Sequence, residues 1–175
     1  FKTNAIKEKR MNKKHKRLLV IVDLENIAQG SSNVAKESKR IRKLVDKQTR
    51  NYQESLIVVS TGRLISVVSP QVLWDWKDAR FIIGNGIDGA DKELLEVLEN
   101  EPIAKSTESI QIWSGDHCFA PVTQKLKKLG CQVDVFSNQG SLAHALSKVA
   151  SNVRILPSQF IRQSDIPTEN DVQYV

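Results

Sequence analysis

The sequence lacks the features that define several common classes of protein. None of its apolar runs is long enough to span a bilayer, and the run after the basic N-terminus, Leu18 to Val22, is too short for the core of a signal peptide. Its only two cysteines, Cys118 and Cys131, have neither metal-binding nor redox spacing. We therefore expect a cytoplasmic protein with free thiols and no membrane partner.

Motifs for nucleophilic catalysis and for nucleotide cofactors are also missing. The three histidines, His15, His117 and His144, are scattered, and no Ser-His-Asp or Cys-His arrangement is apparent. Neither a P-loop nor a Gly-x-Gly-x-x-Gly segment is present. Functions that need a catalytic triad or a nucleotide cofactor therefore have no support in the sequence.

Positive charge is unevenly distributed along the chain. Residues 1–17 carry a net charge of +7 while the whole chain carries +6, so the remainder sums to about −1. We expect a disordered basic leader at 1–17, a folded domain at 18–156 and a polar tail or linker at 157–175. The leader either binds a polyanion or is simply solvated.

A second basic cluster lies inside the expected domain. Apolar residues recur at helical spacing between Val34 and Tyr52, which predicts a helix. The other positions of this segment are crowded with basic residues: Lys36, Lys39, Arg40, Arg42, Lys43, Lys47 and Arg50. This cluster favours a polyanion partner more strongly than the leader does, with a solvated helix face as the alternative.

Short apolar runs alternate with amphipathic segments along the domain. Strands are expected at 18–22, 56–59, 80–83, 110–113 and 133–136, with a last short edge strand at 153–156. The first run is uniformly apolar, which indicates a central strand buried on both faces. The alternation of strands and helices predicts an α/β fold with a parallel sheet and right-handed crossovers.

Local signals mark some of the helix ends. A short helix is expected near 69–76, with Pro70 in its first turn, and Ser141 is a candidate N-cap for the helix before the last strand. Trp74 and Trp76 could stack on bases, but we expect them to pack against the sheet.

Acidic residues follow three of the expected strands. Asp23 ends the first strand, Asp116 follows the fourth, and Asp91 opens the helix after the third. The carboxyl ends of parallel strands share one edge of a sheet, so we expect the three side chains to meet. Like charges at one place repel unless a cation lies between them, and oxygen ligands favour Mg²⁺ or Mn²⁺. Such ions serve phosphoryl chemistry.

Asp91 also has a structural explanation. It shares the core-facing stripe of its helix with Leu94 and Leu98, in the first turn. Asp88 could be the N-cap of that helix, with Asp91 completing a variant of the capping box. This alternative explains Asp88 better than it explains Asp91.

Three motifs in this order resemble the NYN domain, a branch of the PIN-like nucleases. They are Val-Asp-Leu-Glu-Asn at 22–26, Asp-Gly-Ala-Asp at 88–91 and Ser-Gly-Asp-x-x-Phe at 114–119. The resemblance covers roughly Leu18 to Leu156. It implies a PIN-like three-layer α/β/α sandwich with a central, mainly parallel sheet of about five strands, and the activity of a metal-dependent endoribonuclease.

The resemblance also assigns roles to single residues. It maps the acidic metal site, and with it catalysis, onto Asp23, Asp91 and Asp116. Asn26 matches the polar residue that helps to order the first acid, and Ser114 matches the small residue before the last acid. We group Ser114 with the expected RNA contacts. The other expected RNA contacts are Lys36, Lys39, Arg40 and Lys43.

Our main hypothesis is an endoribonuclease that uses Mg²⁺ or Mn²⁺. Many NYN members carry a further Asp where this chain has Cys118, so we expect one metal ion rather than two. That difference also leaves an inactive RNA-binding module as the first alternative. The second alternative is a phosphatase with Asp23 as its nucleophile, although that class commonly has a second Asp at the position of Glu25.

Overall fold

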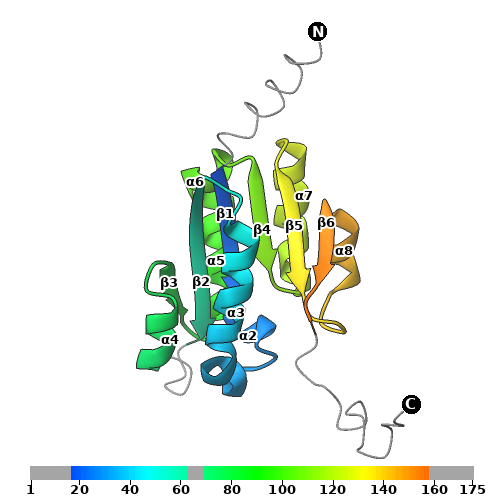
Figure 1. The fold of residues 1–175 in the computed structure, drawn as a ribbon. Helices are drawn as coiled ribbons and strands as arrows, with labels where there is room; N and C mark the ends of the chain where they lie inside the picture. Colours follow the sequence, from blue (N-terminus) through cyan, green and yellow to red (C-terminus); the bar gives the residue numbers. More distant parts are fainter. Residues whose placement is uncertain (1–16, 63–68, 158–175) are drawn as a thin grey trace, which may run out of the picture.

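The computed structural model describes residues 17–62 and 69–157 as one α/β unit (Figure 1). The expected leader, except for Arg17, and nearly all of the expected tail lie outside the described residues. Among the described helices, none combines the length and the apolarity needed to cross a bilayer. In chain order the elements are β1 (Arg17–Asp23), α2 (Leu24–Ile27), η1 (Ser31–Asn33), α3 (Val34–Thr49), β2 (Glu54–Gly62), α4 (Pro70–Asp75), β3 (Arg80–Gly84), α5 (Gly89–Asn100), α6 (Pro102–Lys105), β4 (Ser109–Trp113), η2 (His117–Phe119), α7 (Ala120–Lys128), β5 (Gln132–Ser137), α8 (His144–Val149) and β6 (Asn152–Ile155).

The central sheet is parallel throughout, with the strand order β3-β2-β1-β4-β5-β6. The chain builds one half of the sheet outward from β1 and then returns to the other side of β1 with β4. In open sheets of this kind, ligands bind at the carboxyl edge where the strand order reverses. Here that place lies between the ends of β1 and β4.

The predicted α/β/α sandwich is confirmed, but the sheet has six strands rather than about five. The additional strand is β6, which pairs with β5 from Asp134↔Asn152 to Ser137↔Ile155 and forms one edge. Its four residues all lie in the exposed part of the structure, so it is a short edge strand, as its sequence indicates.

The side chains of β1 alternate between two hydrophobic layers. Leu18, Val20 and Val22 pack on the side of α2, α3 and α4, whereas Leu19 and Ile21 pack on the side of α5, α7 and α8. All five residues are at most 2 % exposed. The expectation of a central strand buried on both faces is therefore confirmed, and the two layers hold the carboxyl end of β1 in place.

Two helix ends have ordinary capping chemistry. The hydroxyl of Ser69 accepts a hydrogen bond from the Val72 N–H at 3.3 Å, just before Pro70 opens α4. Gly130 closes α7 with φ 91°, and the Cys131 N–H behind it donates to the Leu126 carbonyl at 3.1 Å.

Other local expectations were wrong. Helix α8 begins at His144 with Ala143 as its N-cap, because Ser141 is used in a turn in which its N–H donates to the Asn138 carbonyl. Asp88 is the N-cap residue of α5, as the alternative explanation expected, but it has φ 54° and makes no side-chain capping bond, so the expected capping box is wrong.

The two tryptophans of the α4 region have different environments. Trp76 is 1 % exposed, and its indole N–H donates to the Ser38 hydroxyl at 3.1 Å. Trp74 is 66 % exposed, with the Lys77 ammonium 4.6 Å from the centre of its ring. Packing against the core is therefore confirmed for Trp76 and wrong for Trp74.

Candidate metal centre

Asp23 is the last residue of β1 and the N-cap of α2. Its Oδ1 accepts a hydrogen bond from the Asn26 N–H at 3.1 Å, and its Oδ2 accepts one from the Ser114 hydroxyl at 3.0 Å. The residue is only 4 % exposed. The strand-to-helix turn thus holds a carboxyl group in one orientation, at the point where the strand order reverses.

Ser114 links this carboxyl group to the end of β4. Its hydroxyl donates to Asp23 and also accepts a hydrogen bond from the Asp116 N–H at 3.2 Å. The side chain is fully buried, so it does not reach a surface where RNA could contact it. We had expected Ser114 to contact RNA. In this structure its hydroxyl instead positions Asp23 and Asp116.

Two asparagines fasten α2 to the neighbouring loops. The Asn26 Oδ1 accepts a hydrogen bond from the Gly115 N–H at 2.9 Å, while the Asn26 N–H holds Asp23. The buried Asn138 amide donates to the Ile27 carbonyl at 2.9 Å. The side chain of Asn26 therefore ties α2 to the loop after β4, while it is the backbone N–H of Asn26 that holds Asp23.

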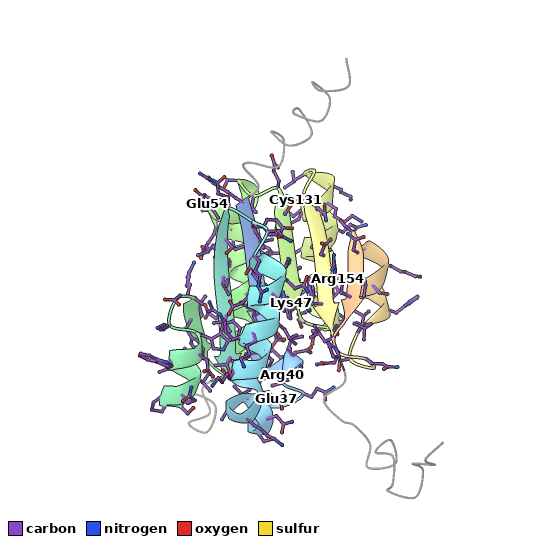
Figure 2. The ribbon with its side chains drawn as sticks, in the orientation of Figure 1. Glu37, Arg40, Lys47, Glu54, Cys131 and Arg154 are labelled. Atoms are coloured by element: carbon purple, nitrogen blue, oxygen red, sulfur yellow. The ribbon has the colours of Figure 1, made fainter. Side chains whose placement is uncertain are left out.

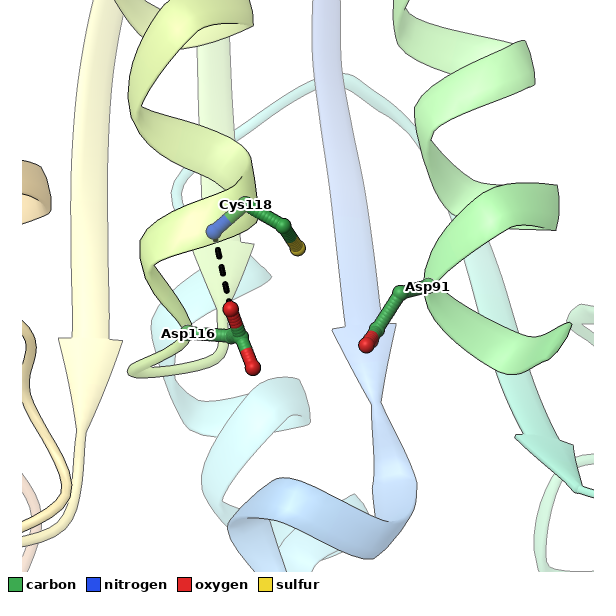
Figure 3. Close-up of side chains that lie close together, drawn as sticks. All are labelled: Asp91, Asp116 and Cys118. Atoms are coloured by element: carbon green, nitrogen blue, oxygen red, sulfur yellow. Dashed lines mark hydrogen bonds between the residues drawn. The ribbon is translucent and has the colours of Figure 1, made fainter. Parts of the chain in front are cut away.

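Asp91 reaches the site because α5 begins directly against the end of β3. A Cβ atom on Gly84 would lie 2.2 Å from the Ala90 nitrogen, and one on Gly89 would lie 2.8 Å from the Gly84 carbonyl carbon. Only glycine allows the backbones to approach this closely. This contact places the first turn of α5, and with it Asp91, opposite Asp116 (Figure 3).

The three predicted acids line one cavity, which we call the acidic pocket. Its volume is about 230 Å³. Its charged and amide lining residues are Asp23, Glu25, Asn26, Asp88, Asp91 and Asp116. The expected meeting of three carboxylates from β1, α5 and the end of β4 is therefore observed.

Burial and mutual repulsion perturb two of these carboxyl groups. Burial, followed by the charge of Asp91, raises the pKa of Asp23 to about 7, against the hydrogen bonds from Asn26 and Ser114 that lower it. Burial also raises the pKa of Asp91, with the charge of Asp116 adding to the effect and a hydrogen bond with Asp23 opposing it. Without a cation, Asp23 and Asp91 are thus driven to share a proton.

The tightest group of possible metal ligands differs from the expected one. One carboxylate oxygen each of Asp91 and Asp116 and the sulfur of Cys118 all lie within 4.8 Å of one another (Figure 3). Asp23 does not belong to this group, although its carboxyl group is hydrogen-bonded to that of Asp91. The described residues therefore present a cluster of two carboxylates and a thiol that could hold a metal ion, with a third carboxylate beside it.

Besides Asp88, which the sequence suggested only as a helix cap, two residues of the site were not assigned to it from the sequence. Cys118 was treated only as a departure from the family pattern. Glu25 lines the acidic pocket, and its Oε1 accepts hydrogen bonds from the Thr61 hydroxyl at 3.0 Å and the Gly62 N–H at 2.6 Å. The available signal was short spacing, since each lies two residues after an aspartate of the site.

The thiol of Cys118 is not a reactive thiolate in this environment. Burial raises its pKa, and the charges of Asp91 and Asp116 raise it further. The backbone N–H of Cys118 donates to Asp116 Oδ1 at 2.8 Å, which orients that carboxylate (Figure 3). Cys118 therefore affects the site both through its backbone and through its side chain.

The four basic residues of α3 that were expected to contact RNA are exposed or half-buried. Lys36, Lys39 and Lys43 are exposed, whereas Arg40 is half-buried and its Nε donates to Glu37 Oε2 at 2.6 Å (Figure 2). We call these four cationic residues the basic stripe. The half of α3 that holds Glu37 and Arg40 lies at the edge of the molecule where β1 and β2 end (Figures 1 and 2).

Comparisons with known proteins identify the fold and nothing further. No family model and no curated protein matches the chain. A crystal structure of a protein of unknown function from Vibrio parahaemolyticus is similar, with a TM-score of 0.60 and 15% sequence identity. The likeness covers 83% of this chain and 96% of that chain. At this identity it supports the α/β/α architecture alone.

Proposed function

We propose that this protein is a metal-dependent endoribonuclease of the NYN type. The observation that carries the proposal is the acidic pocket at the reversal of strand order, into which β1, α5 and the end of β4 bring Asp23, Asp91 and Asp116. Burying carboxylates together is unfavourable, as the raised pKa of Asp23 shows, and a bound cation removes the penalty.

The donor atoms fit a divalent cation. Carboxylate oxygens are ligands for Mg²⁺ and Mn²⁺. One carboxylate oxygen of Asp91 and one of Asp116 lie within 4.8 Å of each other. Ser60, in register with Asp23 on β2, is fully buried, and its hydroxyl has no hydrogen-bond partner among the described residues. An unsatisfied buried hydroxyl beside Asp23 is consistent with a water molecule or an ion in the site.

The residues of the chain divide into three roles. Asp91, Asp116 and Asp23 would hold the cation, which when bound supplies a hydroxide and neutralises charge on the phosphate. Ser114 and Asn26 position these acids through the bonds described above. The basic stripe would attract the phosphates of a single-stranded RNA to this edge of the sheet.

The test compares aspartate variants inside and outside the pocket. Asp23→Asn and Asp116→Asn should each lower single-turnover cleavage of a labelled RNA with Mn²⁺ by orders of magnitude. Asp134→Asn is the matched control, since Asp134 is a 7 % exposed aspartate of β5 that does not line the acidic pocket. RNA binding in chelator should survive in all three variants, because binding relies on the basic stripe.

The same assay separates the alternatives. Full cleavage by either pocket variant would refute the metal-site assignment. A parent protein that binds RNA but cleaves none with any divalent metal would support the inactive RNA-binding module, which the replacement of an expected acid by Cys118 favours. An aryl phosphate tested in parallel addresses the phosphatase. We expect no turnover, because both oxygens of Asp23 accept hydrogen bonds and the side chain is almost fully buried.

A further inference from the structure

We propose that Cys118 is a ligand of this metal centre and that its sulfur shifts the preference of the site from Mg²⁺ toward thiophilic ions such as Zn²⁺ and Cd²⁺. The proposal rests on the metal centre of the proposed function. It does not depend on RNA being the substrate or on catalysis.

The first support is the geometry of the three ligand atoms. The sulfur of Cys118 and one oxygen each of Asp91 and Asp116 lie within 4.8 Å of one another (Figure 3). Ligands that share a tetrahedral zinc ion, at about 2.3 Å for sulfur and 2.0–2.2 Å for oxygen, lie roughly 3.5 Å apart. Small side-chain rotations therefore suffice to bring the three atoms onto one ion.

The second support is the way in which η2 presents Asp116 and Cys118 together. Asp116 is the N-cap of η2, and its Oδ1 accepts the hydrogen bond from the Cys118 N–H. His117 Nδ1 lies 3.0 Å from the same oxygen. Both of these contacts use Oδ1, and Figure 3 shows the side chains of Asp116, Cys118 and Asp91 gathered around one space.

A purely structural role for Cys118 is the competing explanation. The side chain is half-buried and packs against the hydrophobic layer that contains Leu19 and Ile21, as a small apolar residue would. Packing alone does not require a sulfur beside two carboxylates. A metal ion would use all three groups as ligands. The thiol would give its proton to solvent as the sulfur–metal bond forms.

The consequence for metal choice follows from ligand softness. Thiolates favour Zn²⁺ and its softer relatives, whereas Mg²⁺ requires oxygen ligands and retains its waters. An all-carboxylate site also binds Zn²⁺ more tightly than Mg²⁺, so the absolute order of affinities does not decide the matter. The informative quantity is the change in the Cd²⁺-to-Mg²⁺ affinity ratio when sulfur is replaced by oxygen at position 118.

The experiment titrates Cd²⁺ into the full chain in the absence of RNA. The readout is the ultraviolet charge-transfer absorption of a cadmium–thiolate bond. Cys131→Ser is the matched control, because Cys131 is the only other cysteine and lies at the opposite edge of the sheet, where its Sγ contacts the Thr107 carbonyl at 3.2 Å (Figure 2). Cys118→Ser and Cys118→Asp remove the sulfur, and the second of these supplies an oxygen ligand instead.

We expect the absorption band in the parent protein and in Cys131→Ser, and its loss in both Cys118 variants. Cys118→Asp should also lower the Cd²⁺-to-Mg²⁺ affinity ratio at least about tenfold. Cd²⁺ binding without the band in the parent, or a band that persists in Cys118→Ser, would overturn the proposal. If the Cys118 variants do not fold, the parent and Cys131→Ser still decide it, because a band in both assigns the thiolate to Cys118.

The outcomes also keep this inference separate from the proposed function. A cadmium–thiolate band in a protein that cleaves no RNA would retain Cys118 as a ligand and reject the ribonuclease. Efficient cleavage with Mg²⁺ in a protein that shows no band would retain the ribonuclease and reject Cys118 as a ligand.

Discussion

The acidic pocket and the basic stripe are held in very different ways. In the pocket, Asp23, Glu25 and Asp116 each accept hydrogen bonds from named partners, and burial raises the pKa of Asp23. In the stripe, Lys36, Lys39 and Lys43 are exposed on the surface of α3. Ionising the buried carboxyl groups of the pocket costs free energy, a cost that exposed carboxyl groups on a solvated surface would not carry. The three lysines of the stripe are exposed to solvent, so only their effect on binding can identify their role.

A second hollow shows that size alone does not indicate a site. The larger groove, of about 580 Å³, lies beside the end of α3 over β4, β5 and β6. Its buried carboxylate, Asp134, accepts hydrogen bonds from the amides of Gln132 and Asn152. The Asp134 carboxylate is thus paired with neighbouring amides, whereas the carboxylates of the acidic pocket repel one another. The smaller cavity is therefore the better candidate for ionic chemistry.

The largest expected effect tests the penalty at Asp23. Its pKa is raised from the ordinary 3.8 to about 7 in the folded protein, so the folded state binds the proton more tightly than the unfolded state between these values. The free energy of unfolding contributed by this group is then highest near pH 4 and falls as the pH rises to about 7, by on the order of 4 kcal/mol.

Urea unfolding in chelator, measured between pH 5 and pH 8, checks this expectation. Asp23→Asn should flatten the fall and be more stable than the parent at pH 8. Adding Mn²⁺ should restore stability to the parent protein and not to the variant. Equal pH dependence in the two proteins would show that the pocket carries no such penalty and would remove the main contrast with the stripe.

The next effect concerns the stripe. Lys36, Lys39 and Lys43 changed together to Glu should weaken RNA binding roughly 100-fold at low salt, and should reduce the slope of log affinity against log salt by about 2. Arg40 is left unchanged because its side chain is already paired with Glu37 within α3. Filter binding at several salt concentrations, in chelator, measures both quantities.

The control for this reversal is an equal change of charge on the other face of the sheet. Three exposed lysines of α7 are suitable, namely Lys125, Lys127 and Lys128. Changing them to Glu should leave the affinity within about threefold of the parent. Similar losses from both faces would mean that net charge, rather than the stripe, attracts the nucleic acid.

A smaller effect tests the contact that places Asp91. The methyl group of Gly84→Ala would lie 2.2 Å from the Ala90 nitrogen, so α5 must move away from β3. We expect a loss of about 1–3 kcal/mol in unfolding free energy, together with weaker Mn²⁺ binding as Asp91 shifts. Calorimetry and urea unfolding measure these changes. Undiminished metal binding in a destabilised variant would show that the close contact between β3 and α5 is not needed to place Asp91 for the metal.

The architecture was predictable because its determinants are local in the sequence. The apolar run before Asp23 and the run before Ser114 each define a buried strand, and alternation with helices makes the strands parallel. The meeting of Asp23 and Asp116 follows from their positions at the ends of β1 and β4, which are neighbours in the sheet. The number of strands was less certain because β6 has only four residues.

The details of the site were not predictable in the same way. Whether Cys118 points toward Asp91 depends on the single turn of η2, and whether Glu25 faces the pocket depends on its bonds to β2. One-turn elements such as η2 have no periodic pattern in the sequence. The burial of Ser114 likewise results from tertiary packing. The sequence does not show this burial, and Ser114 was therefore grouped with the RNA contacts.

The smallest effect distinguishes two roles of Asp91 within the pocket. As a carboxylate in the first turn of α5 it would stabilise the helix by about 0.3–1 kcal/mol through the dipole. Against this, burial and the charges around it raise its pKa, which makes the ionised form unfavourable. Asp88 makes no side-chain capping bond, so a reciprocal capping box, which would add to the helix role, is absent at this end of α5.

We therefore expect Asp91→Asn to be as stable as the parent in chelator at neutral pH, or more stable by up to about 1 kcal/mol. Thermal melts of the two proteins in chelator, and again with Mn²⁺, make the measurement. The metal should raise the melting temperature of the parent alone, because the variant has lost one charged ligand. A clear loss of stability in chelator would instead mean that Asp91 serves to stabilise the start of α5. The acidic pocket would then have one metal-ligand candidate fewer.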